Sequence, residues 1–494
     1  MFKSAFLFAA LLSVSASADI GPVYQEHCAE CHGADRLGAM GPALLPENLG
    51  RLRPAKAEAI IRDGEVASQM EGFADKLTGE EISALIDYIF TPTDEVPVWN
   101  EASINASHII AVGPATLAEK PIFDADPLNL FVVVESGDHH VTILDGDTFE
   151  PLTRFQSRFA LHGGAKFSPD GRFTYLASRD GWVTKYDLYT LQIVAETRAA
   201  INTRNIAVSS DGKYVLAGNT LPHNLVVLDG GDLSLIKILP VTSASGESSR
   251  VSAVYNAPPR HSFVAALKDF KEVWELPYGQ MGVEGADLTP RRLQVDTVLD
   301  DFMFDQDYKM IIGAARDLEK GQIIDLGTGK KKAEIELAGM PHLGSGITWD
   351  LNGRTVFATP HLTEAKISVI DMDSWETVKE IETGGPGFFM RSHETTNYAW
   401  AGVFFGPNKD LIHIIDKNTL KIVKTLKPAP GKTAAHVEFT RDGSHALVSV
   451  LEEDGALIIY EAKTLEEVKR LPMKRPVGKY NVYNKTHYVE GTSH

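Results

Sequence analysis

Hydrophobic and polar positions follow a repeating pattern over most of the chain. From about residue 105 onward, short runs rich in Val, Ile and Leu end at an acidic residue, a turn follows, and a second run alternates with polar positions. "LVVLDGGDLSLIKIL" and "IHIIDKNTLKIVKTL" are two copies of this unit. Alternation with a period of two is typical of β-strands. The pattern therefore predicts a β-rich region built from one repeated unit.

Eight copies of the unit can be aligned on their acidic residue. These residues are Asp145, Asp187, Asp229, Glu275, Asp325, Asp371, Asp416 and Glu461, spaced 42 to 50 residues apart. A repeat of this length with four short strands is the blade of a β-propeller. One blade cannot bury both of its faces, so the ring must close, and we expect an all-β eight-bladed propeller over residues 105–494. Its innermost strands would line a funnel along the axis. On the period alone, a propeller that only binds other proteins is the simpler interpretation.

The region before the propeller has a helical pattern instead. "TGEEISALIDYIF" places Thr78 at a helix N-cap and Glu81 three residues later, which is a capping box followed by an amphipathic helix. "GPVYQEHCAECHG" and "AEAIIRDG" predict two further helices. The proline-rich, polar stretch 93–104 predicts a linker. A small all-α domain over residues 19–92 is therefore expected to precede the propeller.

The first residues have the features of a secretory signal peptide. Lys3 is followed by an apolar run, Ala5 to Val14, and by the small residues Ala16-Ser17-Ala18. The run is shorter than the ~20 residues that span a bilayer. We expect residues 1–18 to be a signal peptide and the mature protein to be periplasmic without a membrane span; a buried N-terminal helix is the alternative.

The charge balance limits the class of partner. The chain has 48 basic and 66 acidic residues, a formal net charge of −18. This disfavours non-specific binding to nucleic acid or to an anionic membrane.

The motif Cys28-Ala29-Glu30-Cys31-His32 contains the only two cysteines of the chain. A disulfide is possible in an exported protein, but C-x-x-C-H is the attachment signal for c-type haem. Two thioethers fix the porphyrin edge, and the next residue, His32, then lies under the iron as an axial ligand. The sequence therefore predicts one covalent haem c.

The helices around this motif resemble a small class I cytochrome c, covering residues 19–92. In such domains the second iron ligand is usually a methionine from the loop before the last helix, which implies Met70. Met40 is the competitor. It lies in "MGPAL", which matches the tight turn after the haem-binding histidine, where a proline often packs on the ring.

A haem c domain followed by an eight-bladed propeller resembles cytochrome cd1 nitrite reductase and its relatives. "FALHGGAKFSPDGRFTYLASRDGWVTKYDL" is similar to the segment that carries the proximal ligand of haem d1, at His162. "GMPHLGSGITWDLNGRTVFATPHL" and "FFMRSHETTNYAW" resemble the segments that carry distal histidines, at His342 and His393. "PVGKYNVYNKTHY" is close to the C-terminal signature of the family.

Haem d1 carries many carboxylates, so its binding site should contain basic residues. The candidates at the inner-strand ends of successive blades are Arg179, Arg204, Arg250, Lys268 and Arg391. Tyr480 is a candidate hydrogen-bond partner of the tetrapyrrole. Ordinary surface cations and a packed aromatic residue are the alternatives.

Two departures from the nitrite reductase pattern favour another branch of the family. The haem c domain is short, and "GKTAAHVEFTRDG" has His436 where the reductase pattern has a small residue. A dehydrogenase needs such a base to remove a proton from carbon. These features resemble the dihydro-haem d1 dehydrogenases of haem d1 biosynthesis, which convert a propionate side chain to an acrylate.

The resemblance implies a complete reaction path. His162 holds the macrocycle iron, His436 accepts the proton, and His342 either ligates iron or shapes the distal side. Electrons pass singly to haem c and then to a periplasmic acceptor, and the nitrite reductase receives the finished haem d1. Two alternatives remain: nitrite reduction to nitric oxide, with His342 and His393 supplying protons, or a non-catalytic haem d1 carrier, for which a haem c domain has no use.

Overall fold

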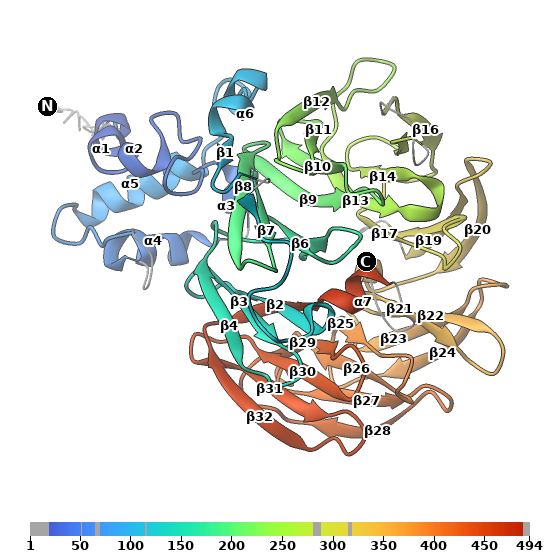
Figure 1. Ribbon diagram of the computed structural model, residues 1–494. Helices are drawn as coiled ribbons and strands as arrows, with labels where there is room; N and C mark the ends of the chain where they lie inside the picture. Colours follow the sequence, from blue (N-terminus) through green and yellow to red (C-terminus); the bar gives the residue numbers. More distant parts are fainter. Residues whose placement is uncertain are drawn as a thin grey trace, which may run out of the picture. The chain divides into compact units, whose positions relative to one another are not determined.

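The computed structural model describes residues 19–50, 52–64, 70–113, 116–279, 288–314 and 319–487. The predicted signal peptide, residues 1–18, lies outside the described residues. The described chain divides into two compact units, one up to residue 92 and one from residue 93 onward (Figure 1). In the described ranges, no helix combines the length and apolarity needed to cross a membrane.

The first unit is helical, as expected for a cytochrome c domain. Its helices are α1 (Gly21–His27), α2 (Ala29–His32), α3 (Pro46–Leu49), α4 (Pro54–Asp63) and α5 (Gly79–Phe90). The predicted capping box at the start of α5 is confirmed, since the Thr78 hydroxyl accepts from the Glu81 amide and the Glu81 carboxylate accepts from the Thr78 amide. One face of α5, formed by Ile82, Leu85, Ile86 and Ile89, packs into the apolar core of this unit.

The second unit contains eight antiparallel sheets, which confirms the eight-bladed propeller. The strands of the first four sheets are β1 (Ile109–Ile110) with β5 (Lys166–Phe167), β6 (Phe173–Ala177), β7 (Trp182–Asp187) and β8 (Gln192–Arg198); β9 (Asn202–Val208), β10 (Tyr214–Leu221), β11 (Asn224–Asp229) and β12 (Leu235–Pro240); β13 (Val251–Ala257), β14 (Ser262–Leu267), β15 (Glu272–Pro277) and β16 (Arg291–Gln294); β17 (Asp301–Phe304), β18 (Met310–Ala314), β19 (Lys320–Asp325) and β20 (Lys330–Glu336).

The remaining four sheets complete the ring. Their strands are β21 (Ile347–Asp350), β22 (Thr355–Pro360), β23 (Lys366–Asp371) and β24 (Thr377–Glu382); β25 (Gly387–Arg391), β26 (Tyr398–Val403), β27 (Ile412–Asp416) and β28 (Lys421–Leu426); β29 (Ala434–Phe439), β30 (His445–Val450), β31 (Gly455–Glu461) and β32 (Glu467–Met473); β33 (Pro476–Asn481) with β2 (Leu130–Glu135), β3 (His140–Asp145) and β4 (Pro151–Gln156). Short 3₁₀ turns η2 (Pro127–Asn129), η3 (Pro258–Arg260) and η4 (Leu343–Ser345) and the helix α7 (Val482–Thr486) lie between or after them.

The ring is closed by strands from its two ends. The last strand, β33, pairs antiparallel with β2, so that Asn481 lies opposite Phe131. Because one sheet contains both the start and the end of the repeat region, the ring cannot open without breaking that sheet. In five junctions, β5 with β9, β9 with β13, β13 with β17, β25 with β29 and β29 with β33, first strands of neighbouring sheets contact one another. The residues on and just before these strands therefore surround the propeller axis (Figure 1).

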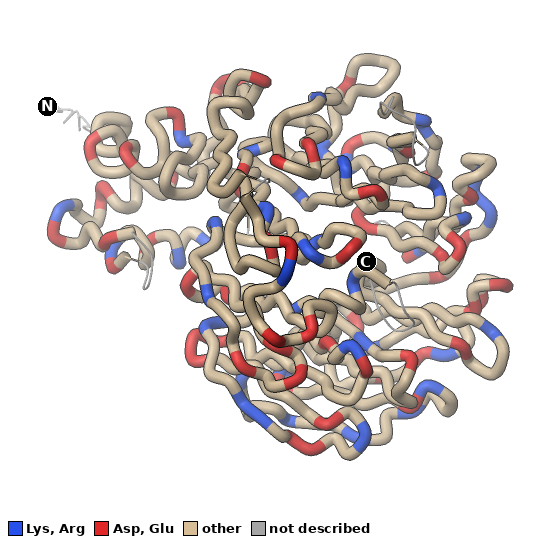
Figure 2. The backbone as a smooth tube through the Cα atoms, viewed as in Figure 1, with Lys and Arg blue, Asp and Glu red and all other residues tan. Residues whose placement is uncertain are grey.

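The repeated acidic residue has a structural role. It is the last residue of the third strand in seven of the eight sheets, and Glu275 comes two residues before the end of β15. The Asp371 carboxylate accepts hydrogen bonds from the amides of Asp373 and Ser374, each at 2.9 Å, and so caps the turn to the fourth strand. Glu275 instead pairs with Arg260 and Arg291. Acidic and basic residues are interspersed along the turns of the propeller (Figure 2).

The expected linker is partly ordered against the propeller. Residues 101–104 belong to α6 (Glu101–Ser107), where Ile104 is fully buried. Just before α6, the Trp99 indole donates to the Arg198 carbonyl at 2.9 Å, and the Arg198 guanidinium lies over the Trp99 ring. Apolar residues in a proline-rich stretch thus provide packing that composition alone does not reveal.

Candidate functional site

The C-x-x-C-H motif lies at the junction of α1 and α2. Cys28 and Cys31 are both free thiols and partly exposed, and burial, with the neighbouring Cys31, raises the pKa of Cys28 to about 11. The buried His32 ring donates from Nδ1 to the Pro42 carbonyl at 2.8 Å. Its Nε2 is therefore the unprotonated nitrogen, the state that an iron ligand requires. A Cβ at Gly41 would lie 2.9 Å from His32 Cε1, so glycine allows this turn to approach the ring.

The two candidate methionines differ in burial. Met40 is 55% exposed, whereas Met70 packs against the apolar core of the helical unit, as Cys28 does. A thioether beside a covalently attached porphyrin must lie on the inside of the domain. The residues present fit a haem c with His32 and Met70 as axial ligands, and burial favours Met70 over Met40.

His162 precedes β5 at the propeller axis and is held in one tautomer. Its Nδ1 lies 3.0 Å from the Arg204 carbonyl, to which it can only donate. Nε2 therefore accepts, and Arg179 Nη2 donates to it at 3.0 Å. A carbonyl that fixes the far nitrogen is the usual arrangement behind a metal-bound histidine. His162 thus fits the role of axial ligand. In this structure Arg179 donates a hydrogen bond to its Nε2.

Residues from all eight sheets follow one another around the axis. Arg204 on β9 lies beside His162 and acts electrostatically on Tyr255 of β13. The Tyr255 hydroxyl donates to Asp301 of β17 at 2.9 Å, and Asp301 accepts from the Gly344 amide of η4, also at 2.9 Å.

The other half of this axial ring is aromatic. The ring of His342, which precedes η4, lies 4.1 Å from that of Phe388 on β25, and Phe389 packs edge-on against His436 of β29 at 4.9 Å. His436 packs on Tyr480 of β33 at 5.3 Å. The Tyr480 ring returns to the first blade, because a Cβ at Gly164 would lie 3.2 Å from it. We call the set of these residues the axial ring: His162, Arg204, Tyr255, Asp301, His342, Phe388, Phe389, His436 and Tyr480.

His342 is also fixed in one tautomer. The Ser345 hydroxyl donates its proton to the Phe388 carbonyl or to the His342 carbonyl, so its oxygen accepts from His342 Nδ1. Nε2 is therefore the unprotonated nitrogen of His342. This state suits either iron ligation or acceptance of a proton.

His436 occupies a β-bulge. The register of β29 shifts between Ala435 and Val437, and His436 has φ of +52°, in the left-handed region that L-residues rarely adopt. Burial, together with the positive charges of Lys479, Arg391 and Lys485, holds the pKa of His436 well below its usual value of 6.5. Neither ring nitrogen hydrogen-bonds to another described residue, and Nδ1 is fully buried. A neutral imidazole is thus held against two aromatic rings and is able to take up a proton.

His393 lies away from the axial ring. It follows β25 and is 1% exposed. Its Nδ1 interacts with the Thr395 amide and hydroxyl, and a Cβ at Gly443, in the turn between β29 and β30, would collide with its ring. The first strand β25 ends before His393, and the His393 ring packs against the turn of the next blade, so its role as a second distal histidine stays a prediction.

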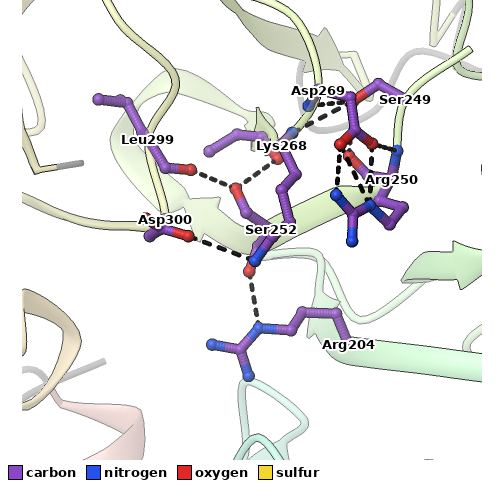
Figure 3. Close-up of polar contacts among 9 residues, drawn as sticks. Arg204, Ser249, Arg250, Ser252, Lys268, Asp269, Leu299 and Asp300 are labelled. Carbon is purple, nitrogen blue, oxygen red and sulfur yellow. Dashed lines mark hydrogen bonds and ion pairs between the residues drawn. The ribbon is translucent and has the colours of Figure 1, made fainter. Parts of the chain in front are cut away.

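The predicted cations divide into two groups. Arg179 and Arg204 lie at His162, but Arg250 pairs with Asp269, and Lys268 pairs with Asp300 at 3.3 Å. Figure 3 shows both pairs, and shows the Arg204 Nε donating to the Ser252 carbonyl. The structure gives Arg250 and Lys268 acidic partners of their own, and their role as carboxylate ligands of the macrocycle stays a prediction.

Arg391, the fifth predicted cation, is 4% exposed and lies 3.4 Å from the Glu438 carboxylate. Burial raises the pKa of Tyr480 to about 12, so its phenol is a hydrogen-bond donor at neutral pH. Both residues lie at the axis, and their roles in binding the tetrapyrrole stay predictions.

Sequence reasoning missed several residues of the axial region. They are Lys166, Tyr255, Asp301, Phe388, Phe389, Glu438 and Lys485. Tyr255 and Asp301 lie outside the segments that carry the predicted residues, whereas the other five lie in the same segments as His162, His393, His436 and Tyr480. The one available signal was a basic or acidic residue at the inward position of a first strand, where an apolar residue is usual.

Comparisons with known proteins find family models for both parts of the chain. The model "Cytochrome D1 heme domain" matches residues 125–485, and "Cytochrome C oxidase, cbb3-type, subunit III" matches residues 16–89. "Dihydro-heme d1 dehydrogenase" of Pseudomonas aeruginosa is 57% identical over 487 residues, 98% of each chain. "Nitrite reductase" of Stutzerimonas stutzeri is 27% identical over 94% of this chain and 92% of its own. The solved structure "Dihydro-heme d1 dehydrogenase NirN in complex with DHE" has a TM-score of 0.92 at 58% identity, covering 94% of this chain and 99% of that one.

Proposed function

We propose that this chain oxidises dihydro-haem d1 to haem d1. The chain belongs to the Cytochrome D1 heme domain family. The chain has the helical cytochrome c unit and the eight-bladed propeller of a relative named for this dehydrogenase activity, at 57% identity over 98% of both chains. One observation supports the proposal most directly. A neutral imidazole, His436, is held at the axis on a bulge, with no hydrogen bond from either ring nitrogen to another described residue.

The reaction must remove two protons and two electrons. A propionate side chain loses one hydrogen from each of its two methylene carbons, and a carbon–carbon double bond forms between them. Haem c, when attached to Cys28 and Cys31, supplies a one-electron acceptor. It would take the electrons one at a time, and an external acceptor, which we propose to be periplasmic, would receive them from it.

His162 orients the substrate. Its Nδ1 proton is committed to the Arg204 carbonyl at 3.0 Å, so Nε2 is the nitrogen that can bind the macrocycle iron. Arg179, which donates to Nε2 in this structure, must turn away when the substrate binds. Its guanidinium is then available for a carboxylate of the macrocycle.

His436 is the proposed base for the first proton. Burial and three nearby cations keep it neutral, so it can accept a proton. An imidazole with a strongly lowered pKa is a weak base in the empty site. A macrocycle that brings carboxylates to the same cations offsets their charge and raises the pKa of His436 toward the working pH. The substrate thus increases the basicity of the group that deprotonates it.

His342 is the proposed second imidazole of the distal side. Its Nε2 is unprotonated because Nδ1 donates to Ser345. It can take up the second proton or ligate iron. Tyr480, packed on His436, is proposed to donate a hydrogen bond to the tetrapyrrole.

Nitrite reduction and simple carriage of haem d1 are the competing functions. The position of His393 beside Thr395 disfavours the reductase, which would use two distal histidines. Anaerobic incubation of the purified protein with dihydro-haem d1, followed by visible absorption, tests the proposal. We expect conversion to the haem d1 spectrum with reduction of haem c. Binding without conversion would indicate a carrier, and turnover of nitrite with bound haem d1 would indicate the reductase.

We propose that the mature protein is periplasmic and passes haem d1 to the nitrite reductase. The predicted signal peptide supports the first part and the shared macrocycle the second. Mass spectrometry of the exported protein should find cleavage after Ala18 and one covalent haem. Spectral transfer of haem d1 to the cofactor-free reductase tests the second part.

A further inference from the structure

A second layer of charged residues lies next to the axial ring. Lys166 on β5 is four residues after His162, and its Nζ lies 5.7 Å from the centre of the Tyr255 ring. Arg391 is two residues after Phe389, and Glu438 is two residues after His436. The Arg391 and Glu438 side chains are 3.4 Å apart. Lys485 of α7 lies 5.8 Å from the Tyr480 ring, and α7 contacts β5 and β33. These residues therefore continue the axial ring along the axis.

Lys166 is partly buried, and its surroundings differ from those of the buried lysines Lys185 and Lys479. Lys185 donates to the Gly230 and Gly231 carbonyls at 2.9 and 2.8 Å, and Lys479 donates to the Ser449 hydroxyl at 2.8 Å. The Lys166 ammonium makes no hydrogen bond or ion pair with a described residue; it faces the Tyr255 ring, with Nζ 5.7 Å from the ring centre. An ammonium group in such a position is costly unless an anion compensates it.

The charges around Lys166 point to the same conclusion. Burial lowers the pKa of Lys166 to about 8; the Asp301 carboxylate opposes this shift, and the Arg391 guanidinium adds to it. The Asp301 carboxylate already accepts hydrogen bonds from Tyr255 and the Gly344 amide. Lys166 and Arg391 are therefore two cations within electrostatic reach of each other at the axis. A carboxylate between them would stabilise both.

We propose that Lys166, together with Arg391, binds the carboxylate of the propionate side chain that is oxidised, and so determines which side chain of the macrocycle reacts. The inference rests on the proposed function. Arg391 is adjacent to the pair formed by Phe389 and His436, and Lys166 follows the loop that carries His162. A carboxylate held between the two cations brings its methylene carbons beside His436.

The same contact assists the chemistry. When His436 removes a proton from the carbon next to the carboxylate, negative charge develops toward the carboxylate oxygens. Two cations held at the axis, where Arg391 is buried, stabilise that charge more strongly than cations in water would. The proton goes to His436, and the electrons leave toward haem c as described above. Lys166 thus acts on binding and on the rate of proton removal.

The test compares substrates as well as variants. Wild type, Lys166→Met, Lys166→Gln and Lys166→Arg are each given dihydro-haem d1 and the same macrocycle with its reacting propionate converted to a methyl ester. A hydrogen bond to a charged group is typically worth about 10- to 100-fold. We expect wild type to convert the ester about 10- to 100-fold more slowly than the acid. Lys166→Met and Lys166→Gln should convert the acid slowly and lose the discrimination, and Lys166→Arg should restore much of it.

Lys185→Met is the control, because Lys185 is a buried propeller lysine whose ammonium bonds to the Gly230 carbonyl, away from the axial ring. It should keep the wild-type ratio of acid to ester. A Lys166→Met or Lys166→Gln protein that folds and keeps the wild-type ratio would overturn the inference, even if it were slower. Wild type that fails to convert the acid would overturn the proposed function instead. Thermal unfolding of every variant separates loss of folding from loss of recognition.

Discussion

Replacing His436 by asparagine should remove the proposed base while keeping the backbone. His436 has φ of +52°, and asparagine is one of the few residues that adopt this region at low cost. The asparagine amide is polar but takes up no proton near neutral pH. Alanine at this position would add backbone strain to the loss of the side chain. His436→Asn therefore separates the chemistry from the fold better than His436→Ala does.

The structure sets the size of both effects. The His436 ring packs edge-on against Phe389 at 4.9 Å and Tyr480 at 5.3 Å. Such aromatic pairs contribute about 0.5–1.5 kcal/mol each beyond buried area, so His436→Asn should lower the free energy of unfolding by about 1–3 kcal/mol. Loss of a placed general base slows proton transfer by about 10²- to 10⁴-fold. The rate effect should therefore exceed anything that partial unfolding could cause.

The assay is a single turnover under anaerobic conditions. Protein with oxidised haem c is mixed with a smaller amount of dihydro-haem d1 and with a soluble one-electron acceptor, which takes the second electron. Macrocycle oxidation and haem c reduction are followed by absorption. Affinity is measured separately by titration with the product, haem d1. His413→Asn is the matched control: His413 is 6% exposed, as His436 is, but bonds to Thr425 and the Gly384 amide within one blade.

We expect His436→Asn to bind haem d1 with nearly wild-type affinity and to convert the dihydro form about 10²- to 10⁴-fold more slowly. His413→Asn should be less stable and convert at the wild-type rate. Equal conversion rates for the two variants would refute the assignment of His436 as base. Loss of affinity in parallel with loss of rate would identify His436 as a binding residue.

Three further predictions concern the iron ligands and pH. Met70→Ala should change the haem c spectrum and lower its reduction potential, whereas Met40→Ala should change neither; the reverse result would make Met40 the ligand. His162→Ala should weaken haem d1 binding by more than about tenfold in a titration, and unchanged affinity would remove it from the ligand set. Burial lowers the pKa of His413. At pH values below the usual pKa of histidine, the unfolded chain therefore binds a proton that the folded chain does not, and stability falls as pH decreases. Thermal unfolding between about pH 7 and 5 should show a smaller decrease for His413→Asn than for wild type, and identical slopes would contradict this.

Local patterns predicted the elements well. The capping box at Thr78 and Glu81 depends on side chains three residues apart, so the sequence contains all of it. The acidic residue at the third strand caps the turn that directly follows it. It therefore occurs once in each blade, and the number of its repeats equals the number of blades. The C-x-x-C-H motif is likewise defined by spacing alone, and His32 is held in the tautomer that an iron ligand requires by Pro42, ten residues away.

The axial site was predictable only in part. The segments carrying His162, His342 and His436 were found, and the structure brings those three residues to the axial ring. His393 came from an equally good segment but lies in the turn between β25 and β26, with its ring against Gly443 of the next blade. A matching segment does not show whether a residue belongs to the end of a strand or to the turn after it. A shift of one position along a strand moves the side chain to the opposite face.

The sequence by itself determined a haem attachment motif, a capped helix and eight β-repeats, because each of these depends on neighbours along the chain. Only the tertiary structure decided that β33 closes the ring against β2, that a bulge turns His436 into the axial ring, that Arg250 and Lys268 pair with aspartates, and that Lys166 lies beside Tyr255. These contacts join residues from different blades, and their energies depend on burial and charge at the axis, which no local pattern records.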